Sequence, residues 1–241
     1  MNLPNALTVA RIFAAPVVAA LPFIERWDAR LFAFVLFLVV AITDYYDGKL
    51  ARTHGMVTDL GKLLDPIADK LLLLATFVPM FILVGSGQSL SLWSPAIVTV
   101  ANDVITGVGP GGPGPHDVFP YVTPFGVFGL PWWIIAVVLG REAFMTIYRA
   151  VRASKGEIIS ASRMGKWKTG FQWTWVGATF FWFAAATAAA QYQWHGPWWI
   201  GFAYFNGLVN VVTMIVAVAL TLYSQLLYLR RPKASAVPGS E

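Results

Sequence analysis

Residues 43–70 read TDYYDGKLARTHGMVTDLGKLLDPIADK and form an acidic stretch between two apolar runs. The stretch contains five of the chain's twelve acidic residues. It follows the run LFAFVLFLVVAI and leads into the run LLLLATFVPMFILV. Carboxylates are costly beside segments this apolar, so they indicate either a functional site or the end of a membrane span.

The composition predicts an integral membrane protein. Of the 241 residues, 57% are hydrophobic and 12% are charged, whereas roughly a quarter of the residues in a soluble domain are charged. The chain has no cysteine, which excludes disulfides and thiolate metal sites. Any bound metal must therefore be held by oxygen or imidazole ligands.

Six apolar runs are long enough to cross a membrane as helices, because a spanning helix needs about 20 mostly apolar residues. We expect the spans at 7–24, 31–52, 60–86, 131–153, 168–190 and 197–228. The fold class predicted is all-α, with one membrane domain covering residues 1–241. We expect the first run to be retained rather than cleaved, because Arg11 lies inside it and no cleavage site is clear.

The connection from 87 to 130 is expected to be a long outer loop. It contains the segment GVGPGGPGPHD at 107–117, and proline and glycine at this density would break any helix. The Trp pairs at 132–133 and 198–199 are typical of side chains anchored at a membrane interface.

The basic residues predict the orientation of the chain. With six spans, fifteen of the seventeen Lys and Arg residues fall on the side of the two termini, and only Arg26 and Arg30 fall on the other. By the positive-inside rule, we expect both termini and the acidic stretch to be cytoplasmic. We also expect the protein to lie in the cell inner membrane. The formal charge of +5 then reflects topology and attraction to anionic lipid rather than nucleic acid.

The acidic residues fall on two helical stripes. If the second span stays helical to Arg52, one face at its end carries Asp44, Asp47, Gly48, Ala51 and Arg52. The start of the third span carries a second stripe, formed by Gly61, Asp65 and Asp69. A tight connection between the two helices would bring four carboxylates around one small volume.

Four such carboxylates would repel one another unless cations lay between them. Mg²⁺ or Mn²⁺ fits best, because these hard cations prefer oxygen ligands. Two cations about 3.5 to 4 Å apart are suited to phosphoryl displacement. Gly48, Ala51 and Gly61 would let a nucleotide or diphosphate approach the helix backbone, and Arg52 could hold a phosphate through two hydrogen bonds.

Two other interpretations of the acidic residues remain open at this point. Intramembrane carboxylates also serve as proton relays or cation paths in ion-coupled transporters. Alternatively, Asp44, Asp47 and Asp59 could be ordinary charges at the membrane interface.

The stretch also matches the pattern D-x-x-D-G-x-x-A-R, eight residues, G-x-x-x-D-x-x-x-D, and so resembles the signature of the CDP-alcohol phosphotransferases. Its fixed positions are Asp44, Asp47, Gly48, Ala51, Arg52, Gly61, Asp65 and Asp69. The resemblance implies a six-helix membrane enzyme, usually a homodimer, that transfers a phospho-group from a CDP-linked donor to an alcohol and releases CMP. It further implies that Asp44, Asp47 and Asp65 bind two divalent cations. Asp69 is then both a metal ligand and the base that takes the acceptor's proton.

Segments outside the signature are similar to the bacterial phosphatidylglycerophosphate synthases, a branch of this family. They read NLPNALTVARI at the start of the chain, LLDPIADKLLL, GREAFMTIYR at 140–149 and GKWKTGFQ at 165–172. This narrower likeness implies that CDP-diacylglycerol is the donor and glycerol 3-phosphate the acceptor. The connection 87–130 departs from that branch, because it is longer than expected.

An acceptor phosphate requires cations near the carboxylates, and the basic segment 141–168 contains them. The residues assigned to this role are Arg141, Arg149, Lys166 and Lys168. Glu142 is interpreted as a partner of one of these bases. The cluster favours a phosphorylated acceptor over serine, but it does not separate glycerol phosphate from inositol phosphate, and another phospholipid remains an alternative acceptor.

Overall fold

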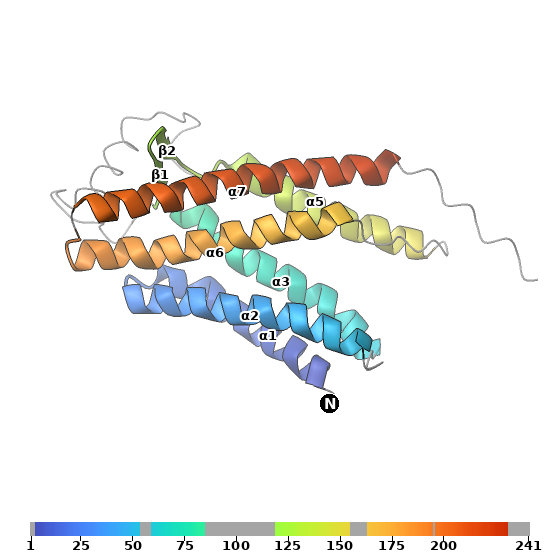
Figure 1. The fold of residues 1–241 in the computed structure, drawn as a ribbon. Coiled ribbons are helices and arrows are strands. Elements are labelled where there is room, and N and C mark those ends of the chain that lie inside the picture. The colour runs from blue at the N-terminus through green and yellow to red at the C-terminus, as the bar shows by residue number, and fades with distance from the viewer. Residues whose placement is uncertain (1–2, 54–58, 85–118, 155–162, 195, 231–241) are drawn as a thin grey trace, which may run out of the picture. The chain divides into compact units, whose positions relative to one another are not determined.

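The computed structural model describes residues 3–53, 59–84, 119–154, 163–194 and 196–230, with only the backbone described at several helix ends. These parts are mostly helical (Figure 1). They group into two compact units. The first unit comprises Met1–Pro131 and Trp175–Val211, and the second comprises Trp132–Thr174 and Val212–Glu241.

Each predicted apolar run corresponds to a helix. The helices are α1 (Leu3–Ala20), α2 (Trp27–Thr53), α3 (Asp59–Leu83), α5 (Trp132–Ala153), α6 (Arg163–Gln191) and α7 (Pro197–Arg230). A 3₁₀ turn, η1 (Leu21–Phe23), follows α1, where Pro22 ends the regular helix. The predicted helical class is confirmed for the parts of the chain that the structure describes.

Among the described residues, three helices are long and apolar enough to cross a membrane. They lie at Asn5–Phe23, Leu64–Leu83 and Pro197–Leu227. For α2, α5 and α6, membrane crossing stays a prediction, and so does the position of the termini. The apolar helices are consistent with a membrane protein.

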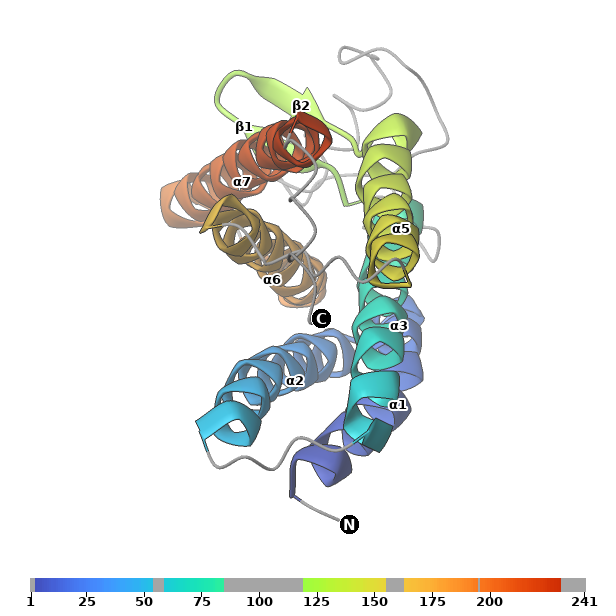
Figure 2. The same cartoon turned by 90° about the vertical axis from the view of Figure 1, so that its right-hand side faces the viewer.

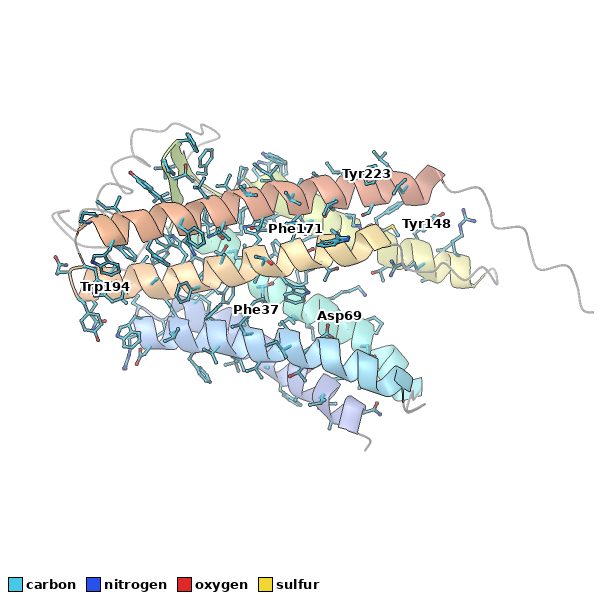
Figure 3. The ribbon with its side chains drawn as sticks, in the orientation of Figure 1. Phe37, Asp69, Tyr148, Phe171, Trp194 and Tyr223 are labelled. Atoms are coloured by element: carbon cyan, nitrogen blue, oxygen red, sulfur yellow. The ribbon has the colours of Figure 1, made fainter. Side chains whose placement is uncertain are left out.

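In the first unit, α1 packs against both α3 and α2 (Figure 2). Aromatic pairs connect α2 and α3 to the part of α6 that belongs to this unit. Phe37, labelled in Figure 3, stacks on Phe180 with ring centroids 5.7 Å apart. Phe77 meets Trp175 edge to face at 5.3 Å. These rings are buried and belong to the apolar core around the helices that carry the acidic stretch.

The end of the predicted loop 87–130 contains a β-hairpin that the sequence analysis did not anticipate. Strands β1 (Tyr121–Thr123) and β2 (Gly126–Phe128) pair antiparallel, with Val122 opposite Val127. In the turn, Thr123 Oγ1 donates to the Gly126 carbonyl at 2.7 Å, and Gly126 has a φ of 144° that favours glycine.

This hairpin is part of the core of the first unit, since Tyr121 and Val122 are at most 1% exposed. Trp175 Nε1 donates to the Tyr121 hydroxyl at 3.0 Å. That hydroxyl also lies 2.9 Å from Thr179 Oγ1, which donates to Asn210 at 2.8 Å. Burial raises the pKa of Tyr121, so the phenol stays protonated and can take part in the network.

Trp199 corrects part of the interfacial prediction. Trp132, Trp133 and Trp198 are exposed, as anchoring side chains should be, but Trp199 is fully buried. It stacks on Trp182 with ring centroids 5.8 Å apart. Adjacent indoles on a helix point in different directions, and on α7 the direction of Trp199 leads to Trp182 in the core.

The second unit comprises α5, the start of α6 and the end of α7. The buried face of α5 follows a helical spacing through Ile134, Val138, Arg141 and Met145. Figure 3 labels Tyr148 on α5, Phe171 on α6 and Tyr223 on α7. The basic residue Arg141 thus lies on the buried face of α5.

Candidate active site

The acidic stretch lies where the sequence predicted, at the end of α2 and the start of α3. Helix α2 continues unbroken to Thr53, and α3 begins at Asp59. The backbone therefore has the helical geometry that both predicted stripes require. The connection 54–58 lies outside the described residues.

Helix α1 brings two side chains to these carboxylates. The Arg11 guanidinium forms an ion pair with Asp44 on α2 and donates to Asp69 on α3 at 3.2 Å. Thr8 Oγ1 donates to Asp65 on α3 at 2.9 Å. Three of the four predicted acids are thus bound to a single face of α1, because Thr8 and Arg11 are three residues apart.

Burial differs sharply within this acidic site. The Arg11 side chain is 3% exposed, while the Asp44 and Asp69 side chains are 36% and 62% exposed. The guanidinium therefore lies behind carboxylates that remain open on their other side. Figure 3 labels Asp69 on α3.

The oxygen donors present are of the kind that Mg²⁺ and Mn²⁺ prefer. Asp44 and Asp69 are already paired with the Arg11 cation, and Asp65 accepts a hydrogen bond from the neutral Thr8 hydroxyl. Among the described side chains, however, no group of three or more Asp, Glu or His residues is arranged to hold a metal ion. Asp47, the fourth predicted ligand, has no described side chain.

The predicted nucleotide-binding residues are only partly described. Gly61 is buried on α3. The side chains of the others lie outside the described part of α2, namely Gly48, Ala51 and Arg52. Their place on the helical stripe of α2 follows from the backbone, and their contacts stay a prediction.

Two of the four predicted acceptor residues, Arg141 and Lys168, lie in a second cluster, within the second unit. Arg141 Nη1 donates to Glu142 at 2.9 Å, and Arg141 Nη2 donates to Ser224 on α7 at 3.2 Å. Lys168 on α6 forms an ion pair with the same Glu142 oxygen. The interpretation of Glu142 as a partner of nearby bases is confirmed.

The two other predicted acceptor residues are Arg149 and Lys166. Arg149 lies two turns along α5 and is exposed. The Lys166 side chain falls outside the described residues. Arg141 and Lys168 share Glu142 as a described partner, and both are buried.

Thr8, Arg11 and Ser224 contribute to these clusters but were not predicted as site residues. Thr8 and Arg11 belong to the segment NLPNALTVARI that resembles the synthases. As polar residues inside an apolar run, they could also have been marked as partners of intramembrane acids. Ser224 had no such signal, because it is 83 residues from Arg141 and serine is common in membrane helices.

The sequence of this chain matches a known protein family over most of its length. A sequence model of the family described as CDP-alcohol phosphatidyltransferase matches residues 1–109 and 117–223. The break between these two segments falls inside the Gly- and Pro-rich part of the connection 87–130.

Curated proteins with similar sequences carry the name CDP-diacylglycerol--glycerol-3-phosphate 3-phosphatidyltransferase. The protein of Rickettsia bellii (strain RML369-C) is 52% identical over 71 residues, which are 30% of this chain and 39% of that protein. The protein of Cereibacter sphaeroides is 32% identical over 170 residues, covering 70% of this chain and 58% of the relative. The protein of Bacillus subtilis (strain 168) is 31% identical over 180 residues, with 70% of each chain covered. The chain thus spans about two fifths of the length of the Rickettsia relative.

Proposed function

Because this chain belongs to the CDP-alcohol phosphatidyltransferase family, we propose that it transfers the phosphatidyl group of CDP-diacylglycerol to the sn-1 hydroxyl of glycerol 3-phosphate. The products are phosphatidylglycerophosphate and CMP. Support for these two substrates comes from the names of the relatives. The observation that carries the proposal is the convergence of Asp44, Asp65 and Asp69 on one face of α1.

We further propose that Asp44, Asp47, Asp65 and Asp69 hold two divalent cations, Mg²⁺ or Mn²⁺. Proteins of this family are generally dependent on divalent metals, and carboxylate oxygens suit these cations. When bound, the cations supply charge neutralisation for the diphosphate and for the departing CMP. Asp44 and Asp69 support this role because their side chains remain open on one side.

The reaction proposed is a direct displacement. The sn-1 oxygen of the acceptor forms a bond to the phosphatidyl phosphorus, and the bond from that phosphorus to the CMP oxygen breaks. Asp69 takes the proton that the hydroxyl loses. Arg52 binds a phosphate of the donor, and Gly48, Ala51 and Gly61 leave room for the nucleotide.

The acceptor phosphate is proposed to bind the basic cluster of Arg141, Arg149, Lys166 and Lys168. Arg141 and Lys168 support this assignment because both are buried and, among the residues that the structure describes, they share one carboxylate, that of Glu142. A doubly charged phosphate would supply the negative charge that this pair of cations lacks.

We propose that the enzyme lies in the cell inner membrane with the acidic stretch at the cytoplasmic face, where CMP and glycerol 3-phosphate can enter and leave. The distribution of Lys and Arg supports this orientation. A homodimer is also proposed, on the resemblance to the family.

The test is CMP release by the purified protein in detergent with Mg²⁺ and CDP-diacylglycerol. Glycerol 3-phosphate, inositol phosphate, serine and a phospholipid are offered in turn, and EDTA replaces Mg²⁺ in a parallel set. We expect CMP release with glycerol 3-phosphate and its loss in EDTA. Release only with another acceptor would overturn the acceptor assignment, and no release with any acceptor would reopen the transporter interpretation.

A further inference from the structure

Arg11 is a buried cation inside the first apolar helix. Its guanidinium contacts carboxylates from two other helices, Asp44 on α2 and Asp69 on α3. A charge inside a membrane helix is costly unless it is paired. Replacing Asp44 or Asp69 would leave the buried Arg11 charge without that partner and would lower the stability of the protein.

Arg11, Asp44 and Asp69 differ in exposure, so the site has a buried side and a side that is open to solvent. Arg11 is 3% exposed, whereas Asp44 and Asp69 are 36% and 62% exposed. A cation that arrives from solvent therefore reaches the carboxylates from the side opposite the guanidinium. Thr8 binds Asp65 from the same face of α1, so this helix forms the closed side of the site.

We propose that Arg11 is a positioning residue of the metal site, a tethered cation that holds Asp44 and Asp69 together until divalent cations bind. The proposal rests on the proposed function, in which these acids are metal ligands. A carboxylate oxygen in an ion pair with a guanidinium is less available to a metal, and two cations near one carboxylate repel each other. Arg11 therefore competes with the metals and weakens their binding in the absence of nucleotide.

The experiment measures Mn²⁺ binding by the full chain in detergent, stripped with EDTA and free of nucleotide, from the electron paramagnetic resonance signal of free Mn²⁺. We expect Arg11→Gln to bind Mn²⁺ about tenfold more tightly than the unchanged protein, because one positive charge has left the site. In EDTA this variant should melt at a lower temperature, since the two carboxylates then lack their cation. Saturating Mn²⁺ should restore most of that loss.

A matched control is Arg30→Gln, because Arg30 is also 3% exposed and lies in the same unit. Arg30 donates to the Pro22 carbonyl at 2.9 Å and covers the Phe119 ring, away from the carboxylates. Its variant should lose the same stability with and without Mn²⁺ and keep the Mn²⁺ affinity unchanged. Equal behaviour of the two variants would mean that Arg11 serves the fold alone and would overturn the proposal.

Arg11→Lys provides a second variant if the glutamine variant does not fold. Lysine keeps the charge but cannot bridge two carboxylates with a planar fork, so we expect a smaller increase in Mn²⁺ affinity. An affinity equal to or weaker than that of the unchanged protein would overturn the proposal.

Asp44→Asn separates this proposal from the proposed function. If the unchanged protein binds no Mn²⁺, or if Asp44→Asn binds it equally well, the metal site itself fails. If Asp44→Asn abolishes binding but neither Arg11 variant strengthens it, only the role of Arg11 is overturned.

Discussion

Asp69 is more exposed than Asp44, and it also contacts the buried Arg11. If it takes the acceptor's proton, Asp69→Asn should lower the rate of CMP release by roughly 10² to 10⁴, the usual contribution of a general base. The amide keeps the size of the side chain and one oxygen ligand. The rate is measured at saturating Mg²⁺, so that weaker metal binding does not cause the loss.

The control for this prediction is Asp28→Asn. Asp28 lies in the first turn of α2, at the other end of the helix from the signature, and pairs with Arg26 on the surface. Its replacement should leave CMP release close to that of the unchanged protein. Near-normal turnover by Asp69→Asn, with Mn²⁺ still bound, would show that another group takes the proton.

Glu142 is the shared acceptor for two buried cations, Arg141 and Lys168. Glu142→Gln would leave these cations facing each other without a carboxylate. We expect a loss of about 1–3 kcal/mol in stability, the usual cost when a buried polar group loses its partner. The thermal midpoint of the purified protein in detergent measures this loss.

Glu25→Gln is the corresponding surface control, because Glu25 is exposed in the turn before α2. Its thermal midpoint should stay within error of the unchanged protein, as expected for most surface substitutions. If Glu142→Gln were equally harmless, the described ion pairs would contribute nothing to stability.

The candidate acids could be predicted from sequence because they repeat along single helices. Asp65 and Asp69 are one turn apart, and this spacing alone places them on one face. The partners of these acids could not be predicted in the same way. Thr8 and Asp65 are 57 residues apart, and Arg11 and Asp69 are 58 apart. Such contacts depend on how α1 packs against α3, which no local pattern encodes.

At the scale of elements, the hairpin packs against α7 at Gly207. A Cβ atom added at Gly207 would overlap the backbone carbonyl oxygen of Val122 in β1. Backbone cannot move aside as a flexible side chain can. Gly207→Ala should therefore lower the thermal midpoint, with a cost of about 1–3 kcal/mol typical of overpacking.

Gly201→Ala is a matched control on the same helix. A Cβ atom at Gly201 would meet nothing within 4 Å. Alanine there should be neutral or should stabilise the helix by up to about 1 kcal/mol, because glycine is a poor helix former. Equal thermal midpoints for the two variants would mean that the backbone of β1 does not closely approach α7 at Gly207.

The helices could be predicted more fully than the hairpin. Long apolar runs predict spanning helices by length and composition alone. The strands are only three residues each, and they follow a segment where glycine and proline dominate. Their position depends on contacts with Trp175 and Thr179, more than 50 residues away. The buried place of Trp199 was missed for a similar reason, since its partner Trp182 lies on another helix.

At the scale of the whole molecule, the distribution of charge predicts which parts of the chain face the cytoplasm. Phe125 lies at the turn of the hairpin and is 74% exposed, and the positive-inside rule places it on the outer side. Ser154 follows α5, is exposed, and is predicted to be cytoplasmic. Both positions lie outside the residues assigned to the active site.

The natural absence of cysteine makes this orientation directly measurable, because any introduced thiol is the only one in the chain. In intact cells with a permeable outer envelope, a membrane-impermeant maleimide should label Phe125→Cys but not Ser154→Cys. After the inner membrane is disrupted, both should react, which controls for buried thiols. The reverse pattern would place the acidic stretch on the outer side, away from cytoplasmic glycerol 3-phosphate, and labelling of both in intact cells would contradict an odd number of membrane crossings between the two positions.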